Sequence, residues 1–271
     1  MTRATALSLI SSNLRITLAA AMIMLRDRWF MMARGGYIVL WTARPVFDLA
    51  IAALIHASGR TELVSYAVVG ITTNAFIFAT IFWVGEILDR ERMRGTLATL
   101  FLSPGARLSW LGGFTLAGAA ETILSAAVVL FAGIVLFNVV LNVVWVSVIV
   151  VSILFLIALA GMGLVFGALG LLARQANALS NLISPFVMLL GGIYFPVSEL
   201  PFALRIVARL LPFGYATEAI ALATLESAPL SEIWHLVGPL FGFALGLPVL
   251  GYLALGWVDN LIRRQGTLEL Y

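Results

Sequence analysis

Three ionisable side chains, Arg44, Asp48 and Glu121, fall within long apolar stretches of the sequence. Charges in such surroundings are costly, so they persist where they pair with another group or contact a cargo. Arg44 and Asp48 are four residues apart, which puts them on one face of a helix, where they can form an ion pair. The pair would fix a helix against its neighbours or gate a pathway, and Glu121 would hydrogen-bond within a bundle or contact a polar cargo. We favour the structural role for all three.

The remaining residue types exclude most catalytic chemistry. The chain has no cysteine, and its two histidines, His56 and His235, are far apart in sequence. All sixteen basic residues are arginine, so neither a P-loop lysine nor a Schiff base is available. We therefore predict no catalytic residue, no metal site and no cofactor on this chain, and we assign any hydrolysis of Mg-ATP to a separate protein.

Composition indicates an integral membrane protein. Of the 271 residues, 62% are hydrophobic and 11% are charged, with a mean hydropathy of +1.07. Soluble domains are about one quarter charged. One globule cannot bury so much apolar surface, so lipid must be the solvent. The basic residues lie at predicted membrane edges, so the net charge of +3 does not predict a nucleic-acid partner.

Long runs without a charged residue predict an all-α fold with six transmembrane helices, each needing about 20 residues. One run of 52 residues suits two helices, with Asn138 and Asn142 marking the turn between them. The first stretch counts as a span despite its charged pair, because pairing lowers the cost of burial. The runs are Ile38–Ala57, Leu63–Gly85, Thr122–Ala173 extended back to Leu108, Gln175–Ser198 and Ile233–Val258.

The arginines predict the orientation in the membrane. With the N-terminus inside, twelve arginines lie on the inner side and three, Arg60, Arg205 and Arg209, on the outer side. This matches the positive-inside rule, so both termini are expected in the cytosol and the chain in the inner (cytoplasmic) membrane.

Three regions are predicted along the chain. Residues 1–35 form an amphipathic N-terminal interfacial segment, residues 36–258 the transmembrane domain, and residues 259–271 a cytosolic tail. The apolar stretch Ile16–Leu25 has only ten residues between two arginines, too few to span a bilayer and suited to its surface. The alternative for this stretch is an uncleaved signal-like segment.

The segment Glu91–Pro104 is charged and lies between two predicted spans. Gly95 and Pro104 bound a short predicted helix whose Leu97, Leu100 and Phe101 form one apolar stripe. Such a helix in a cytosolic loop fits a groove on a soluble protein, and the alternative is an ordinary solvated loop. The candidate contact residues are Glu91, Arg92, Arg94, Gly95, Thr96, Leu97, Leu100, Phe101, Ser103 and Pro104.

A second segment, Tyr194–Leu225, fits neither a loop nor a simple span. Three prolines interrupt it, and leucines recur at helical spacing with Arg205 and Arg209 on another face. We predict two short helices that dip into the outer half of the membrane or lie on it, before the last span. The alternative, a seventh span broken by prolines, would place the C-terminal arginines outside.

Both segments resemble one known family. The pattern E-R-x-x-G-T-L-x-x-L-x-x-S-P in Glu91–Pro104 is similar to the loop between the second and third helices of type-2 ABC transporter permeases. The patterns F-P-x-x-x-L-P at Phe195–Pro201 and L-P-x-x-Y-A-x-E-A at Leu211–Ala219 are similar to the region before the last helix of that family. The resemblance extends in order over nearly the whole chain.

The resemblance implies the function. Two such subunits, identical or paralogous, would enclose a pathway in the lipid bilayer, with two cytosolic ABC ATPase subunits beneath them. Glu91–Pro104 would be the coupling helix, and the N-terminal helix would make a second contact with the ATPase. The family likeness also points to an outer gate formed by Phe195, Pro196, Pro201, Pro212, Tyr215 and Glu218.

Two departures weaken parts of the family pattern. Ala98 replaces a common Glu, which removes one polar contact to an ATPase. Ala221 replaces an Arg that is common shortly after the E-A pair, which puts the family's outer gate in doubt here.

The sequence therefore favours the membrane subunit of an ATP-driven exporter for an amphiphilic cargo, with drug or antibiotic efflux ahead of a lipid or a lipid-linked glycan. One alternative is an ion-coupled secondary transporter that works without an ATPase and uses Glu121 and Asp48 as proton sites. A membrane enzyme acting on lipid is disfavoured, because no nucleophile and base are paired in the sequence.

Overall fold

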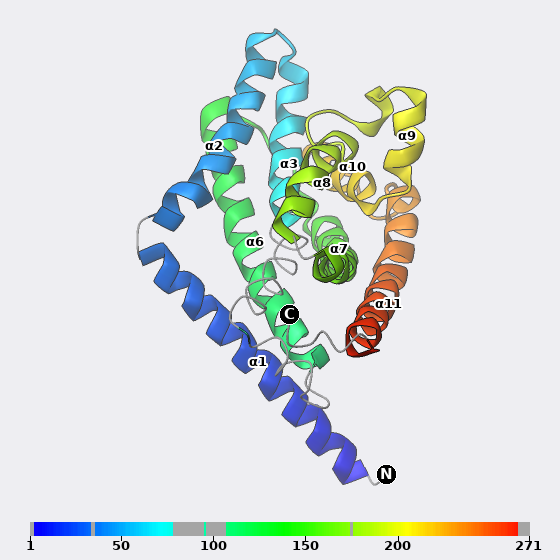
Figure 1. The fold of residues 1–271 in the computed structure, drawn as a ribbon. Coiled ribbons are helices and arrows are strands. Elements are labelled where there is room, and N and C mark those ends of the chain that lie inside the picture. Colours follow the sequence, from blue (N-terminus) through cyan, green and yellow to red (C-terminus); the bar gives the residue numbers. More distant parts are fainter. Residues whose placement is uncertain (1–2, 34–35, 78–94, 96–106, 174–175, 265–271) are drawn as a thin grey trace.

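The structure is a computed structural model that describes residues 3–33, 36–77, 95, 107–173 and 176–264. Within these residues the regular structure is nine α-helices and one short 3₁₀ helix, with no strand, so the predicted all-helical fold is confirmed (Figure 1). The elements are α1 (Arg3–Ala33), α2 (Gly36–Ala57), α3 (Thr61–Ile77), α6 (Arg107–Phe137), α7 (Trp145–Ala173), α8 (Ala176–Leu190), η2 (Val197–Glu199), α9 (Phe202–Arg209), α10 (Pro212–Leu225) and α11 (Trp234–Arg264).

Three of the described helices are long and apolar enough to cross a membrane. They are α6, α7 and α11, whose apolar stretches have 22, 26 and 25 residues. Much of their surface is exposed large apolar side chains, as expected where lipid is the solvent. These are three of the six predicted spans, and the other three stay a prediction.

The breaks between helices follow the predicted turn residues. The 52-residue apolar run divides between α6 and α7, and Asn138 there has a φ of 52°, a conformation that asparagine tolerates. The fifth apolar run, in contrast, does not stay helical to Ser198. α8 ends at Leu190, because the chain turns at Gly191 and at Gly192, whose φ is 64°.

The N-terminal segment contains one long helix that packs on α6, and the placement of residues 1–35 at the membrane surface stays a prediction. α1 has 31 residues, and its apolar side chains do not gather on one face. Ala20 and Ala21 face Gly113 of α6, while Leu14 and Met22 are exposed elsewhere on the helix. Among the side chains of α1 that the structure describes, small ones lie toward α6 and several large apolar ones are exposed.

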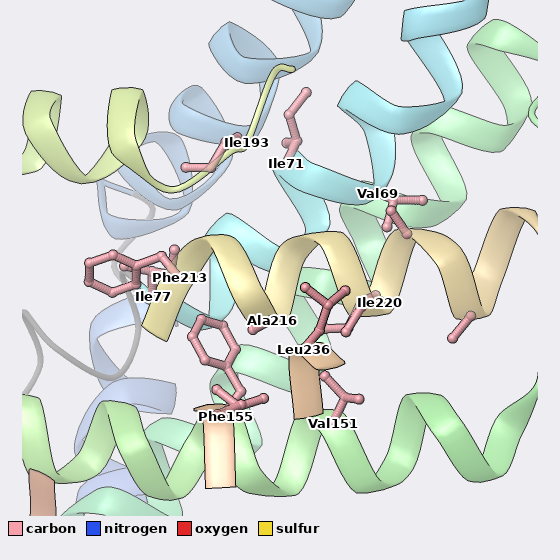
Figure 2. Packing of buried hydrophobic residues seen from close by; sticks show 14 of the residues in the cluster. Val69, Ile71, Ile77, Val151, Phe155, Ile193, Phe213, Ala216, Ile220 and Leu236 are labelled. Carbon is pink, nitrogen blue, oxygen red and sulfur yellow. The ribbon is translucent and has the colours of Figure 1, made fainter. Parts of the chain in front are cut away.

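The core is built around α10, which lies between α3 and α7 (Figure 2). Ten of its fourteen residues are buried, including Phe213, Ala216 and Ile220. Phe155 of α7 and Ile77 of α3 belong to the same apolar cluster and are fully buried. This short helix is therefore an internal element of the bundle.

Two close approaches of the backbone depend on glycine. Gly161 of α7 lies against the backbone of Leu247 and Pro248 in α11, so a side chain there would collide with the main chain. Gly70 of α3 lies against the backbone of Ile193, in the segment that follows α8. Small residues at such crossings let membrane helices approach closely.

Figure 1 also shows which ends of the helices lie together. The turn between α2 and α3 and the helix α9 lie at one end of the molecule, and the N-terminus of α1 lies at the opposite end. α6 runs between these two ends, and its first turn, at Arg107, lies toward the N-terminal end.

Candidate functional site

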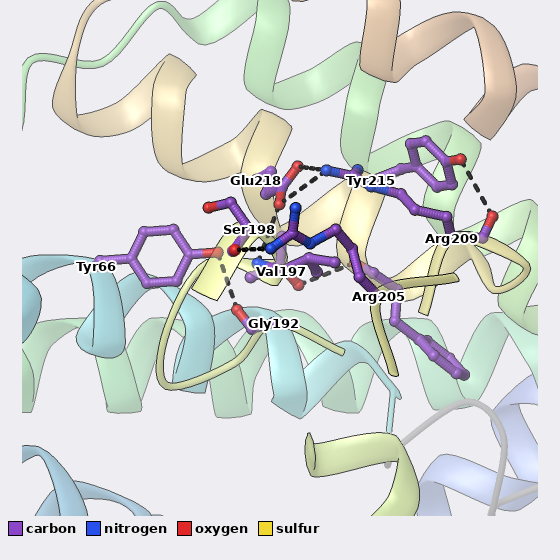
Figure 3. A network of polar contacts seen from close by, with 10 residues as sticks. Tyr66, Gly192, Val197, Ser198, Arg205, Arg209, Tyr215 and Glu218 are labelled. Atoms are coloured by element: carbon purple, nitrogen blue, oxygen red, sulfur yellow. Dashed lines mark hydrogen bonds and ion pairs between the residues drawn. The ribbon is translucent and has the colours of Figure 1, made fainter. Parts of the chain in front are cut away.

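A network of polar contacts lies between the end of α8 and the middle of α10 (Figure 3). Residues from α3, η2, α9 and α10 contribute to it, although they are spread over more than 150 positions of sequence. It coincides with the second of the two segments singled out by the sequence, so we take it as the candidate functional site.

Glu218 of α10 occupies the centre of this set. Its carboxylate accepts two contacts from Arg209, with Nη2 2.9 Å from Oε2 and 3.2 Å from Oε1. Oε1 also accepts a hydrogen bond from the backbone N–H of Val197, at 3.1 Å. That N–H opens η2 and has no partner within the helix, so the carboxylate caps it. One side chain thus holds both η2 and α9 against α10.

Arg209 is held in place by more than its charge. Its guanidinium lies 5.0 Å from the centre of the Tyr215 ring, within the range of a cation–π contact. The hydroxyl of Tyr215 in turn donates to the backbone carbonyl of Arg209, at 3.1 Å. The side chain of Arg209 is 34% exposed and that of Glu218 14%, so solvent weakens this pair only in part.

The three predicted gate prolines each stand at the start of a helix. Pro196 precedes η2, Pro201 precedes α9, and Pro212 is the first residue of α10. Proline is favoured there because the missing N–H would have no helical partner. Between them, Arg205 donates to the carbonyls of Ser198 and Leu200, which holds η2 and α9 together as one piece.

The residues just before this segment are attached to α2 and α3. Tyr66 of α3 donates its hydroxyl proton to the carbonyl of Gly192, at 3.0 Å. Tyr194 donates to Asp48 of α2, at 3.1 Å. Asp48 is 6% exposed, so this hydrogen bond provides a polar partner to a buried carboxylate.

The far end of α10 is attached to the loop between α6 and α7. The N–H groups of Asn142 and Val144 donate to the carbonyls of Thr224 and Ala223, at 2.8 and 2.9 Å. These contacts satisfy two carbonyls of the last helical turn. α10 is thereby anchored at its C-terminal end.

One buried amide is an exception to the rule of paired polar groups. Asn74 of α3 is 1% exposed, and neither its Nδ2 nor its Oδ1 has a hydrogen-bond partner in the described part of the chain. Its neighbour Thr73 is equally buried but donates to the carbonyl of Val69. Among these same residues, no three His, Asp or Glu side chains gather as a metal site would require.

The predicted site residues fall into three groups. The coupling residues lie outside the described residues except for Gly95, which is exposed with a φ of 70°, a turn conformation that suits glycine. Of the intramembrane candidates, Asp48 is buried and bonded as above, Glu121 is half-buried midway along α6, and the side chain of Arg44 is not described. The gate candidates are brought together around η2, α9 and α10.

Sequence reasoning missed the partners of these residues. Arg209 was noted only as an arginine on a helix face, and Tyr66, Tyr194 and Asn74 were not singled out. Tyr66 and Gly192 are 126 positions apart, so no local spacing joins them. The only available signal was a polar residue within an apolar run, which applies to Asn74.

Comparison with known proteins identifies the family. The family model described as ABC-2 type transporter matches residues 19–224, from the middle of α1 to the last turn of α10. No curated protein matches the sequence. The match covers more than half of the chain and agrees with the long apolar helices of a multi-pass membrane protein. The chain belongs to the ABC-2 type transporter family.

Proposed function

We propose that this chain is the membrane subunit of an ATP-driven exporter and that separate cytosolic ABC ATPase subunits hydrolyse the ATP. The observation that carries the proposal is the family match over residues 19–224, which includes the whole of Glu91–Pro104. The absence of lysine supports a separate ATPase subunit, because the phosphate-binding loop of an ABC ATPase needs a lysine. The chain itself is then not an enzyme.

The topology that we propose has six spans, α2, α3, α6, α7, α8 and α11, with both termini in the cytosol of the inner membrane. The distribution of arginines supports this orientation. The arrangement in Figure 1 is consistent with it, because the turn between α2 and α3 lies at the opposite end of the molecule from the N-terminus. The pair α9 and α10, bent by 91°, would then lie in the outer half of the membrane.

Two copies of the chain, or one copy and a paralogue, would form the pathway between them. The cargo is an amphiphile: a drug or antibiotic, a lipid or a lipid-linked glycan. Support comes from the apolar character of the helices, since a small charged solute would need polar groups along its path.

Coupling would begin at Glu91–Pro104. This segment lies between α3 and α6 in the sequence, so we expect a push on it to act on both helices. α3 also packs on α10 and touches Ile193 through Gly70, which gives the push a direct route to the outer segment. Closure of the ATPases would thus reach the far side of the membrane through one helix.

Co-purification with the ATPase tests this proposal. We expect the double change Leu97→Asp and Leu100→Asp to abolish association while membrane insertion is kept, because two carboxylates cannot enter an apolar groove. The matched control is Ala57→Asp with Ser58→Asp, which places the same charges at the exposed end of α2 and in the turn that follows it, and it should leave association intact.

The outcomes separate the candidate functions. Unchanged association of the Leu97 and Leu100 variant would remove the coupling helix from the proposal. Cargo movement by the purified chain with no ATPase present would favour the ion-coupled carrier instead.

A further inference from the structure

The segment between Tyr194 and Pro212 is attached to the protein differently from α10, which follows it. α9 exposes six successive residues, from Phe202 to Val207, and buries Ala208. α10, in contrast, is buried over most of its length. The two helices of the bent pair therefore differ in how firmly the bundle holds them.

A small apolar cluster separates this segment from the main core. Val197, Leu200 and Ala208 pack with Leu190 in a cluster distinct from the one that contains α10. Satellite clusters of this kind can open without unfolding the rest of a protein. Arg205 ties the two halves of the segment together, so residues 195–210 can move as a unit.

Both ends of this unit are defined by fixed neighbours. On one side Tyr194 is bonded to Asp48 and Ile193 lies against Gly70. On the other side, Leu211 has an extended backbone immediately before α10 begins at Pro212. α10 cannot follow easily, because its last turn is bonded to the loop between α6 and α7.

The side-chain hydrogen bonds that join the unit to the fixed body converge on α10. Glu218 accepts from Val197 and Arg209, and Tyr215 donates to the Arg209 carbonyl (Figure 3). Loss of the Glu218 charge would therefore weaken two of these three contacts at once, which makes Glu218 the principal polar attachment of the unit.

We propose that residues 195–210 form a lid that opens while α10 stays in place, and that Glu218 holds the lid closed through Arg209 and Val197. Glu218 acts here as a positioning residue. That the lid gates the exit of cargo rests on the proposed function, whereas its opening is a property of this chain alone.

Thiol labelling tests the lid directly, because the natural chain has no cysteine. Ala208→Cys places a thiol beneath the lid, and Ala223→Cys places one on α10; both alanines are 0% exposed. The purified chain in lipid vesicles, without an ATPase, is treated with a water-soluble methanethiosulfonate that carries a quaternary ammonium group. The rate of labelling then reports how often each thiol reaches water.

We expect Glu218→Gln to speed labelling at position 208 about tenfold while position 223 stays slow. Arg209→Met should also speed labelling at position 208, though less than Glu218→Gln, because it removes the ion pair and leaves the contact of Val197 with Glu218. Glu226→Gln, which removes an exposed acid at the end of the same helix, should leave both rates unchanged. Leu200→Cys, 3% exposed in the same cluster, provides a second reporter if Ala208→Cys fails to fold.

Three results would overturn the proposal. Equal acceleration at positions 208 and 223 would mean that the helix pair moves as a whole. No acceleration at either position would mean that Glu218 does not hold the segment closed. An equal effect of Glu226→Gln would assign the change to net charge. All three are independent of ATPase association, so the lid and the exporter assignment can fail separately.

Discussion

The contact of Gly70 with Ile193 makes the substitution Gly70→Ala a sharp test of the fold. The added Cβ would lie 2.7 Å from the carbonyl carbon and 3.0 Å from the Cα of Ile193, and closer still to its carbonyl oxygen. Favourable contacts between carbon atoms are about 3.5–4.0 Å, so the backbone of Ile193 must move. Overpacking of this kind costs about 1–3 kcal/mol.

The displacement has a second cost and one partial compensation. Moving Ile193 would pull Gly192 away from the Tyr66 hydroxyl, and losing that hydrogen bond costs about 1 kcal/mol. Replacing glycine by alanine within a helix gains about 1 kcal/mol. The net expectation is a loss of about 1–3 kcal/mol.

Gly242→Ala is the matched control. Gly242 is also in a helix, α11, but nothing lies within 4 Å of a Cβ added there, so this variant should gain about 1 kcal/mol. The two variants should therefore differ by about 2–4 kcal/mol in thermal or denaturant unfolding in one detergent. A Gly70→Ala protein as stable as Gly242→Ala would refute the placement of Ile193 against α3.

Two further predictions concern buried polar groups. Asn74→Leu should raise stability by about 1 kcal/mol in the same unfolding assay, because it removes an amide that is buried without a partner in the described chain. The control Thr73→Val removes a bonded hydroxyl and should not raise stability. A less stable Asn74→Leu protein would contradict this prediction. Tyr194→Phe should lower stability by about 1–3 kcal/mol, because it removes a hydrogen bond to the buried carboxylate of Asp48. The control Tyr252→Phe, on the exposed face of α11, should leave stability unchanged. Equal stability of the two variants would show that the Tyr194 contact contributes nothing.

The sequence predicted the helices that apolar runs and turn residues define locally. The division at Asn138 and the two short helices after Pro201 follow from composition and spacing over a few residues. It was less successful with α8, whose apolar run continues past the helix end. Hydropathy does not detect a turn made by Gly191 and Gly192 when the residues beyond it are still apolar.

The family resemblance and the segment Tyr194–Leu225 could also be recognised from the sequence, because Glu218 and the prolines form a known pattern. The pattern did not reveal what Glu218 binds. Ala221 lacks the charge that the family often places there, and the structure shows Arg209 as the basic partner of Glu218, in a different helix.

The sequence alone therefore determined that the chain is helical, that lipid surrounds it and that its apolar runs break at particular turns, since these depend on neighbouring residues and on transfer to an apolar solvent. Only the tertiary structure decided that α10 is buried while α9 lies at the surface, and that Tyr66 meets Gly192. Such contacts join residues that are distant along the chain, and the energy of each pair exists only after the helices have packed.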